Sequence, residues 1–235
     1  MRRLLVLLGL ATAATAVLAA PPTPLPSQEG RLSILQNGQP VGWERYRIVR
    51  TDTEVQARSE SQFQSHDQKV QQRTSLLLNA DLSPRRYEWN IEGDKQAWLR
   101  MDFQDSTATV RYPLPTGKED QQVFKFGTTR VALLDNNVFH HFLLLVQFYD
   151  FSAGGPQTVQ VFVPQSVQPG EAIIELLGVE TQTVDGQPQP VRQLAITTAD
   201  NQVMLSVTES GQFLRLWVPL ANVEVVPAET AETPP

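Results

Sequence analysis

Most of the chain places apolar residues at every second position, and this period restricts the fold more than any other feature. Successive side chains of a β-strand point to opposite faces, so a two-residue period predicts strands that bury one face. The pattern is clear at Ala97, Leu99, Met101 and Phe103, and again at Val159, Val161 and Val163. One-sided burial is typical of antiparallel sheets, in which the other face meets water.

Turn signals divide these runs at short intervals. Asn37-Gly38 readily forms a tight two-residue turn and predicts an opening β-hairpin. Later turns are expected at Pro169-Gly170, Asp185-Gly186, Asp200-Asn201 and Ser210-Gly211. Regular turns between short strands are typical of an antiparallel barrel or sandwich-like sheet, here with roughly a dozen strands.

The alternation is interrupted once, after Asp135. This residue is suited to cap a helix, because its carboxylate can accept hydrogen bonds from free backbone N–H groups. Helical spacing then relates Val138, Phe142, Leu145 and Tyr149, while Phe139, Leu143 and Val146 cover an adjoining face. A helix this apolar must be covered on more than one side. We therefore expect a helix from about Asn136 to Asp150, and a mainly β fold: a strongly curved antiparallel sheet or open barrel wrapped around one buried α-helix.

The N-terminus has the pattern of an export signal. Arg2 and Arg3 precede an uncharged run from Leu4 to Ala20, which ends in small residues. This order predicts a cleaved secretory signal peptide, and an uncleaved membrane anchor is the alternative. The predicted segments are a signal peptide at 1–20, a proline-rich spacer at 21–30, a single β-rich domain at 31–226 and a disordered tail at 227–235. The mature protein is expected to be soluble, periplasmic or secreted, and without an integral membrane span.

The amino-acid composition limits the covalent links and the classes of binding partner that we expect. The chain contains no cysteine, which excludes disulfides and a thiol-linked lipid anchor. Its 19 basic and 25 acidic residues give a net charge of −6, which becomes −8 when Arg2 and Arg3 are removed. A strongly acidic protein repels polyanions, so we expect binding neither to nucleic acid nor to an anionic membrane surface.

The second half also has a recognisable order of features. Leu134-Asp135 precedes the predicted helix through Tyr149, a strand ends at Pro164, and the closing strand begins with Gly211-Gln212-Phe213-Leu214. This order resembles exported β-domains of bacterial envelopes that are catalogued as domains of unknown function. The resemblance covers about half of the chain and implies a curved antiparallel sheet in the periplasm, with no catalytic residues to transfer.

The residues themselves predict no catalytic, metal or cofactor site. His140 and His141 are adjacent on the predicted helix, whereas two ligands of one metal need a spacing of three or four residues. Ser152 precedes two glycines but lacks the nucleophile motif of a hydrolase. Carboxylate pairs such as Asp102 and Asp105 flank expected turns, where acids are ordinarily hydrated. We therefore expect no enzymatic activity. A hydrolase of unrecognised type, with a cleft in which Ser152, His140 or His141 meets a carboxylate, is an alternative.

Large apolar side chains offer walls for a cavity. A curved sheet can leave space beside a buried helix, and such space binds lipid-like ligands in several barrel folds. The candidate lining residues are Phe142, Leu145, Val146, Tyr149, Trp89 and Trp98. Burial in the core explains the tryptophans without a cavity, and a lining role is the alternative. The leading hypothesis is a binding or envelope-accessory protein for an apolar small molecule. A structural protein that pairs with an envelope protein through an exposed sheet edge is the alternative, and the oligomeric state stays open.

Overall fold

The structure is a computed structural model that describes residues 24–65, 68–92 and 97–228. The strands of the first half are β1 (Gln28–Gln36), β2 (Gln39–Arg50), β3 (Glu54–Ser65), β4 (Gln68–Asn79), β5 (Pro84–Glu92), β6 (Ala97–Gln104), β7 (Thr107–Pro113) and β8 (Glu119–Lys125). The second half contains β9 (Ala132–Leu133), α1 (His141–Leu145), η1 (Val146–Phe148), β10 (Gln157–Val163), η2 (Pro164–Ser166), β11 (Gln168–Val184), β12 (Gln187–Thr197), β13 (Gln202–Thr208), β14 (Phe213–Val218), η3 (Pro219–Ala221) and β15 (Val223–Pro227). The predicted signal peptide and the tail beyond Ala228 lie outside the described residues.

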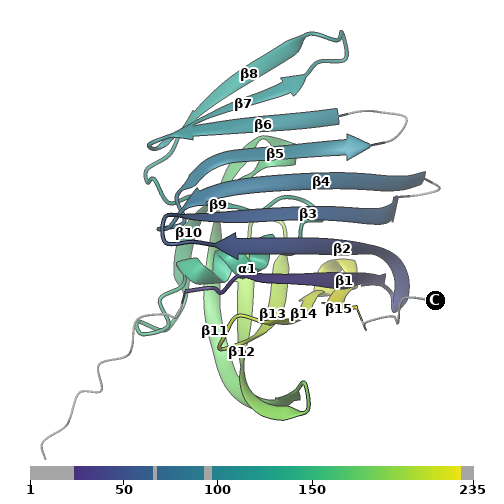
Figure 1. The fold of residues 1–235 in the computed structure, drawn as a ribbon, viewed down its shortest axis with the longest axis vertical. Helices are drawn as coiled ribbons and strands as arrows, with labels where there is room; N and C mark the ends of the chain where they lie inside the picture. The colour runs from purple at the N-terminus through teal and green to yellow at the C-terminus, as the bar shows by residue number, and fades with distance from the viewer. Residues whose placement is uncertain (1–23, 66–67, 93–96, 229–235) are drawn as a thin grey trace, which may run out of the picture.

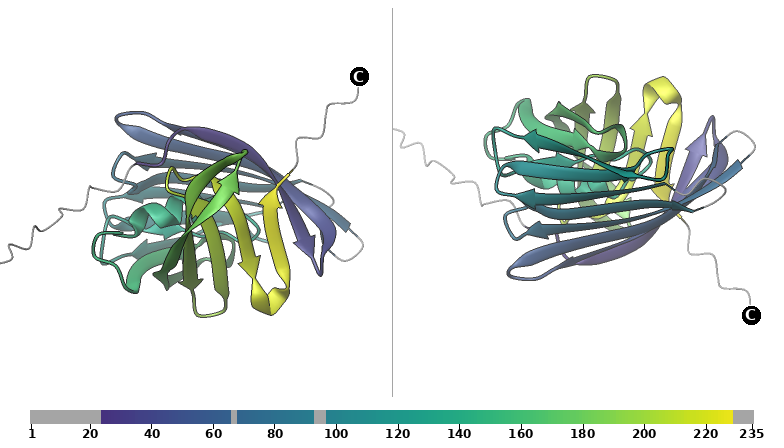
Figure 2. Two further views of the ribbon diagram at one scale, coloured as in Figure 1. Left: turned by 90° about the horizontal axis from the view of Figure 1, so that it is seen from below. Right: turned by 90° about the horizontal axis from the view of Figure 1, so that it is seen from above.

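All of the described strands belong to one sheet. The strand order runs from β8 through β1 to β15 and on to β9, so the pairing of β1 with β15 joins the two halves (Figure 1). Neighbouring strands are antiparallel, except that the two-residue β9 runs parallel to β10. The sheet curves until its halves face each other, with α1 between them (Figure 2). This arrangement confirms the predicted curved antiparallel sheet around a helix.

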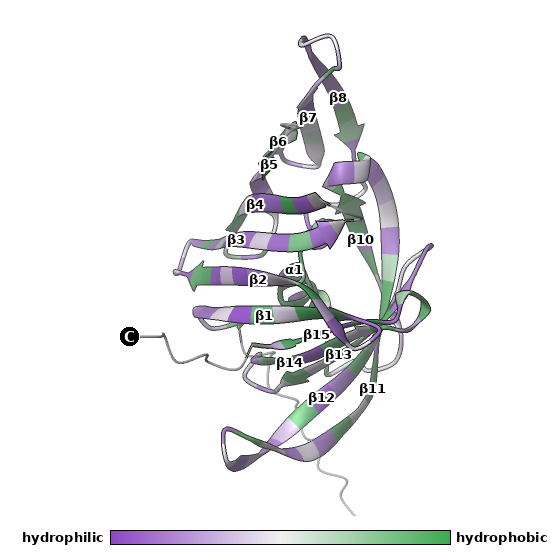
Figure 3. Ribbon diagram, turned by 90° about the vertical axis from the view of Figure 1, so that its right-hand side faces the viewer, coloured by the Kyte–Doolittle hydropathy of each residue, from purple (hydrophilic) through white to green (hydrophobic). Residues whose placement is uncertain are grey.

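The alternating pattern forms strands with one buried face. On β2, for example, Glu44, Tyr46 and Ile48 are buried while Arg45 and Arg47 are exposed. Hydrophobic and hydrophilic bands alternate along strands such as β2 and β12 (Figure 3). The buried faces of both halves form a continuous hydrophobic core with the helical segment. Within the described ranges, no helix combines the length and apolar character needed to cross a bilayer.

Two of the predicted turns are tight hairpins. Asn37 and Gly38 both have positive φ, 51° and 75°, and connect Gln36 to Gln39. Asp185 and Gly186 do the same between β11 and β12, with φ of 52° and 75°. Such paired left-handed residues match the twist of the flanking strands, and glycine adopts them without steric cost.

One predicted turn is wrong. Pro169 and Gly170 lie inside β11, where they pair with Phe162 and Val161 of β10. The chain reverses earlier, through η2, because Pro164 cannot continue the ladder as a donor and its fixed φ suits the first position of a helical turn. β11 accommodates Pro169 and Gly170 because they lie at its start, where a proline is tolerated in a strand.

The sequence pattern also missed three strands, since fifteen are described where about a dozen were expected. β8 has almost no buried position, β9 has two residues, and β15 directly follows η3. Periodicity cannot reveal an edge strand that is polar on both faces or a strand shorter than two periods. At the N-terminal side, β1 begins at Gln28 and Leu25 is already buried, so the folded part extends into the predicted spacer at 21–30.

The predicted helix is too long. Instead of spanning Asn136–Asp150, the helical segment consists of five α-helical residues in α1 followed by the three of η1. Asn137 has a left-handed φ of 58°, which a continuous right-handed helix does not contain. Asp135 does not cap α1, whose N-cap is His140 without a side-chain capping bond of its own. The cap comes from a different strand: Glu44 Oε2 accepts from the N–H groups of Phe139 and His140, at 2.8 and 3.2 Å.

Candidate functional site

A pocket of about 400 Å³ opens between the helical segment and the second half of the sheet. Its walls come from residues 134–142, from 161–171 at the β10–β11 connection, from the β12–β13 turn at 198–203 and from 218–223. The larger apolar side chains that line it are Leu134, Phe139, Phe142, Val161, Val163, Val203, Val218 and Val223, and Pro169, Ala199 and Ala221 also border it. We call this cavity the Phe142 pocket.

Phe142 differs from its neighbours on α1. The other residues of the helix, His141, Leu143, Leu144 and Leu145, are all buried, whereas Phe142 is half-buried. Val163, Val218 and Val223, which line the same pocket, are also half-buried. Partly exposed apolar side chains from four separate segments therefore meet in one concavity, which is the usual character of a small-molecule site.

Only Phe142 among the predicted lining residues reaches this pocket. Leu145 and Tyr149 are fully buried in the core, and the Tyr149 hydroxyl donates to the Gly155 carbonyl at 2.8 Å. Val146 borders a separate void of about 10 Å³, which is at most the size of one water molecule.

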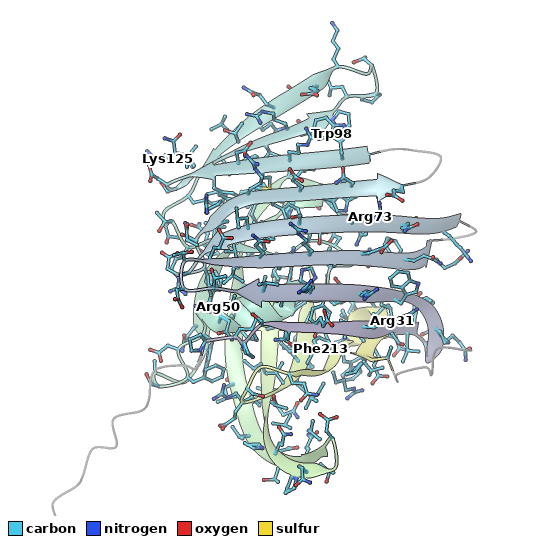
Figure 4. All side chains as sticks on the ribbon, in the orientation of Figure 1. Arg31, Arg50, Arg73, Trp98, Lys125 and Phe213 are labelled. Atoms are coloured by element: carbon cyan, nitrogen blue, oxygen red, sulfur yellow. The ribbon has the colours of Figure 1, made fainter. Side chains whose placement is uncertain are left out.

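The two predicted tryptophans lie elsewhere. Trp89 is buried on β5, and its Nε1 donates to Gln72 Oε1 at 3.0 Å. Trp98 lies near the start of β6 (Figure 4), and the Arg100 guanidinium lies over its ring, 5.1 Å from the ring centroid. Neither is part of the Phe142 pocket.

The residues that form the remaining walls of the pocket were not predicted from the sequence. Val163, Val203, Val218 and Val223 sit on different strands and look like ordinary core positions in the alternating pattern. Nothing in their own neighbourhoods distinguishes a valine that faces a cavity from one that faces packed core. The one available signal was Phe142, which lies within the apolar interruption of the strand pattern.

Next to the pocket, a buried polar cluster connects the helical segment to β2. Glu44 and His140 are each fully buried, and His140 Nδ1 lies 2.7 Å from Glu44 Oε1. Because the other carboxylate oxygen accepts two backbone N–H groups, Glu44 has three partners in the same segment. The His140 ring also stacks on Tyr46, with 5.9 Å between centroids. The cluster thereby fixes where Phe139 and Phe142 lie.

Asp135 is the second carboxylate of this cluster, and it also borders the Phe142 pocket. The Tyr87 hydroxyl donates to its Oδ2, while Oδ1 accepts from the N–H groups of Asn136 and Gln165, both at 3.0 Å. Burial raises the pKa of Asp135 to about 6 despite these hydrogen bonds, which favour the charged form. Burial and the adjacent Asp135 charge raise the pKa of Tyr87 well above its ordinary value.

His141 completes the cluster as a buried neutral ring. Its Nδ1 accepts from the Asp135 N–H at 3.4 Å, which places the proton of the neutral imidazole on Nε2. Burial, and then the neighbouring His140, hold the pKa of His141 well below its ordinary value. Within the described residues, three buried side-chain polar atoms lack a hydrogen-bond partner: His140 Nε2, His141 Nε2 and Ser61 Oγ.

The residues considered for hydrolysis meet carboxylates at two separate places, one exposed and one fully buried, and do not share a cleft. Ser152 lies in the turn after η1, where its Oγ donates to Asp150 at 2.6 Å. The carboxylate that meets His140 is Glu44, and both side chains are closed off from solvent. Asp102 lies on the surface between Arg86 and Arg111, at 2.9 and 3.0 Å. Among the described residues, no group of three or more His, Cys, Asp or Glu side chains is arranged to hold a metal ion.

Comparison with known proteins identifies the fold and no family. No protein-family model matches the sequence, and no curated protein matches it. Among solved structures, a β-barrel-like protein of the domain of unknown function DUF1849 from Brucella abortus is similar, with a TM-score of 0.60 and 12% identity. The similarity covers 86% of this chain and 95% of that chain.

A DUF1089 family protein from Pseudomonas aeruginosa is similar with a TM-score of 0.50 and 12% identity, over 74% of this chain and 88% of that chain. At these identities the likeness concerns the fold alone. This chain therefore shares a β-barrel-like fold with the first neighbour. Both neighbours belong to domain-of-unknown-function families, the type of domain that the sequence resembles, and neither bears on export.

Proposed function

We propose that this protein is an exported, non-catalytic binding protein that holds an apolar small molecule in the Phe142 pocket. The observation that carries the proposal is the convergence of half-buried apolar residues, Phe142 with Val163, Val218 and Val223, on one cavity. A volume of about 400 Å³ lies in the range of about 300–1,000 Å³ that is usual for small-molecule sites.

The buried cluster supports the same proposal. A binding site gains affinity when its walls are fixed before the ligand arrives. Glu44, on β2, accepts hydrogen bonds from the backbone N–H groups of Phe139 and His140. These buried hydrogen bonds hold the wall formed by residues 134–142 in place. Export to the periplasm or the medium is part of the proposal and rests on the basic, apolar and small-residue order of residues 1–20.

Uptake of the uncharged dye N-phenyl-1-naphthylamine tests this function. Ala199 lines the pocket from an exposed turn position, so Ala199→Trp fills the mouth without disturbing the core. We expect the wild type to bind the dye and Ala199→Trp to bind it at least about tenfold more weakly. Val179→Trp is the matched control, because Val179 is exposed on β11 and does not line the pocket.

Native mass spectrometry of the protein purified from its own cells complements the dye. We expect a co-purifying apolar molecule that Ala199→Trp loses and Val179→Trp retains. A wild type that takes up no dye and carries no bound molecule, or an Ala199→Trp variant that binds like the wild type, contradicts the proposed function. Export is checked separately, by fractionation and N-terminal sequencing of the mature chain.

The edge of the sheet favours a second candidate, self-association through β8. This strand ends at Lys125 and is the edge strand on one side of the described sheet (Figure 4). The Phe126 N–H donates to the Ser106 carbonyl, on the β7 side, so alternation turns the N–H groups of Gln121 and Val123 to the open edge. Antiparallel pairing of two copies centred on Gln122 then sets Glu119 opposite Lys125 at both ends.

A substitution at that edge tests self-association. Val123→Pro removes an outward N–H and should abolish a dimer in light scattering coupled to size-exclusion chromatography. Val123→Thr keeps the N–H and is the control. A wild type that stays monomeric at high concentration contradicts this candidate and leaves the pocket proposal untouched.

A further inference from the structure

The polar rim of the Phe142 pocket is acidic. Glu171, at the start of β11, and Asp200, in the β12–β13 turn, both line it and are exposed. No lysine, arginine or histidine is among its lining residues. Within the described part of the chain, neither Glu171 nor Asp200 has an ion-pair partner within 4.0 Å. The rim therefore has negative charge that no ion pair among the described residues neutralises.

Asp135 does not supply this rim with a free acceptor. Both of its oxygens are already engaged, by the Tyr87 hydroxyl and by two backbone N–H groups. It nevertheless places a third carboxyl group in the wall, on the inner side of the pocket. A fatty acid or phospholipid head inserted here would meet carboxylates and no cation. Like charges at short range in a partly desolvated site oppose binding.

From this charge distribution we infer that the ligand of the Phe142 pocket is a single-chain amphiphile with a cationic head group. Its chain lies against Phe142, Val163, Val203 and Val218, and its ammonium group lies at the mouth near Glu171 and Asp200. The inference rests on the proposed function, because it names the ligand class of the same pocket. An apolar lining alone would bind an alkyl amine and an alkyl carboxylate of the same length equally well. The acidic rim predicts that the amine binds more tightly.

Three ligands of equal chain length test the inference: dodecylamine, dodecanol and dodecanoate, each below its aggregation concentration. They compete with bound N-phenyl-1-naphthylamine at neutral pH and low salt. We expect dodecylamine to displace the dye at about tenfold lower concentration than dodecanoate, with dodecanol between them. The difference should shrink at high salt, because exposed charges are screened.

The paired substitution Glu171→Gln and Asp200→Asn should remove the preference for the amine and leave dodecanol binding unchanged. The matched control, Glu175→Gln with Asp185→Asn, removes two exposed acids of β11 and its hairpin turn that do not line the pocket. This control should keep the preference of the wild type. The two variants have the same net charge, so a general charge effect cannot produce the difference.

The outcomes distinguish the inference from the function on which it rests. If neither the dye nor any of the three ligands binds, the proposed function fails. If dodecanol binds but dodecanoate binds as tightly as dodecylamine, the head-group inference is overturned and the pocket remains a binding site. If the control variant loses the preference as fully as the rim variant, the rim carboxylates are not its source, and the inference is likewise overturned.

Discussion

Glu44 on β2 and His140 at the start of α1 lie 96 residues apart in the sequence and form a fully buried pair, with 2.7 Å between Oε1 and Nδ1. The same carboxylate accepts the backbone N–H groups of Phe139 and His140. One side chain from the first half of the sheet therefore begins the helix of the second half. This relationship places the wall of the Phe142 pocket.

Removal of that carboxylate should be costly. Glu44→Ala leaves two backbone N–H groups and a buried imidazole without an acceptor, and we expect the free energy of unfolding to fall by about 3–5 kcal/mol. Glu44→Gln retains one acceptor oxygen and should lose less. Urea denaturation measures both. Glu29→Ala is the control, because the Glu29 side chain is 72% exposed and its pair with Arg47 is loose at 3.8 Å. A loss for Glu44→Ala as small as that of the control would contradict the role assigned to Glu44.

The raised pKa of Asp135 predicts a pH dependence of stability. In the folded protein the pKa is about 6, against an ordinary value of 3.8, so the folded state binds more protons between these values. The stability that protonation supplies is complete below about pH 4 and is lost as the pH rises through 6. Relative to Asp135→Asn, the wild type should therefore gain about 2 kcal/mol between pH 7 and pH 4. A pH-independent difference between the two proteins in urea denaturation would contradict the burial of a charged Asp135.

The lowered pKa of His141 predicts a change of stability with pH that is opposite in sign to that of Asp135. The unfolded state binds a proton below about pH 6.5, whereas the buried ring stays neutral. The stability contributed by the neutral ring is complete above 6.5 and is lost as the pH falls. His141→Gln should be less stable than the wild type at pH 7.5, because it loses the ring contact with Tyr87. That deficit should shrink by about 1.4 kcal/mol for each pH unit below 6.5. Thermal denaturation at three pH values checks this, and a deficit that grows on acidification would contradict it.

The close approach of β2 and β3 predicts a matched pair of glycine substitutions. A Cβ at Gly42 would lie 2.4 Å from the Gln62 carbonyl oxygen and 2.9 Å from the Phe63 Cα, so backbone would have to move. Gly42→Ala should destabilise the protein by about 1–3 kcal/mol. A Cβ at Gly178, in β11, would meet nothing within 4 Å. Gly178→Ala should be neutral or slightly stabilising, because it restricts the unfolded chain. Equal effects of the two substitutions would contradict the observed register.

Much of the candidate site could not be predicted from the sequence. Phe142 was found because it lies in the apolar interruption of the strand pattern, and it lines the pocket. Leu145 and Tyr149 share the same pattern but face packed core, since the short helix turns them away from the cavity. The valines of the opposite wall come from β10, β13, β14 and β15, and their convergence depends on the curvature of the whole sheet.

The sequence by itself determined the strand faces and the tight hairpins. Alternation and turn dipeptides such as Asn37-Gly38 act between residues that are neighbours in the chain, so their effect is readable locally. The tertiary structure alone decided the length of the helix, the cap from Glu44 and the walls of the pocket. Each of these depends on contacts between residues that are far apart in the sequence. Local periodicity does not specify which distant residues will be in contact.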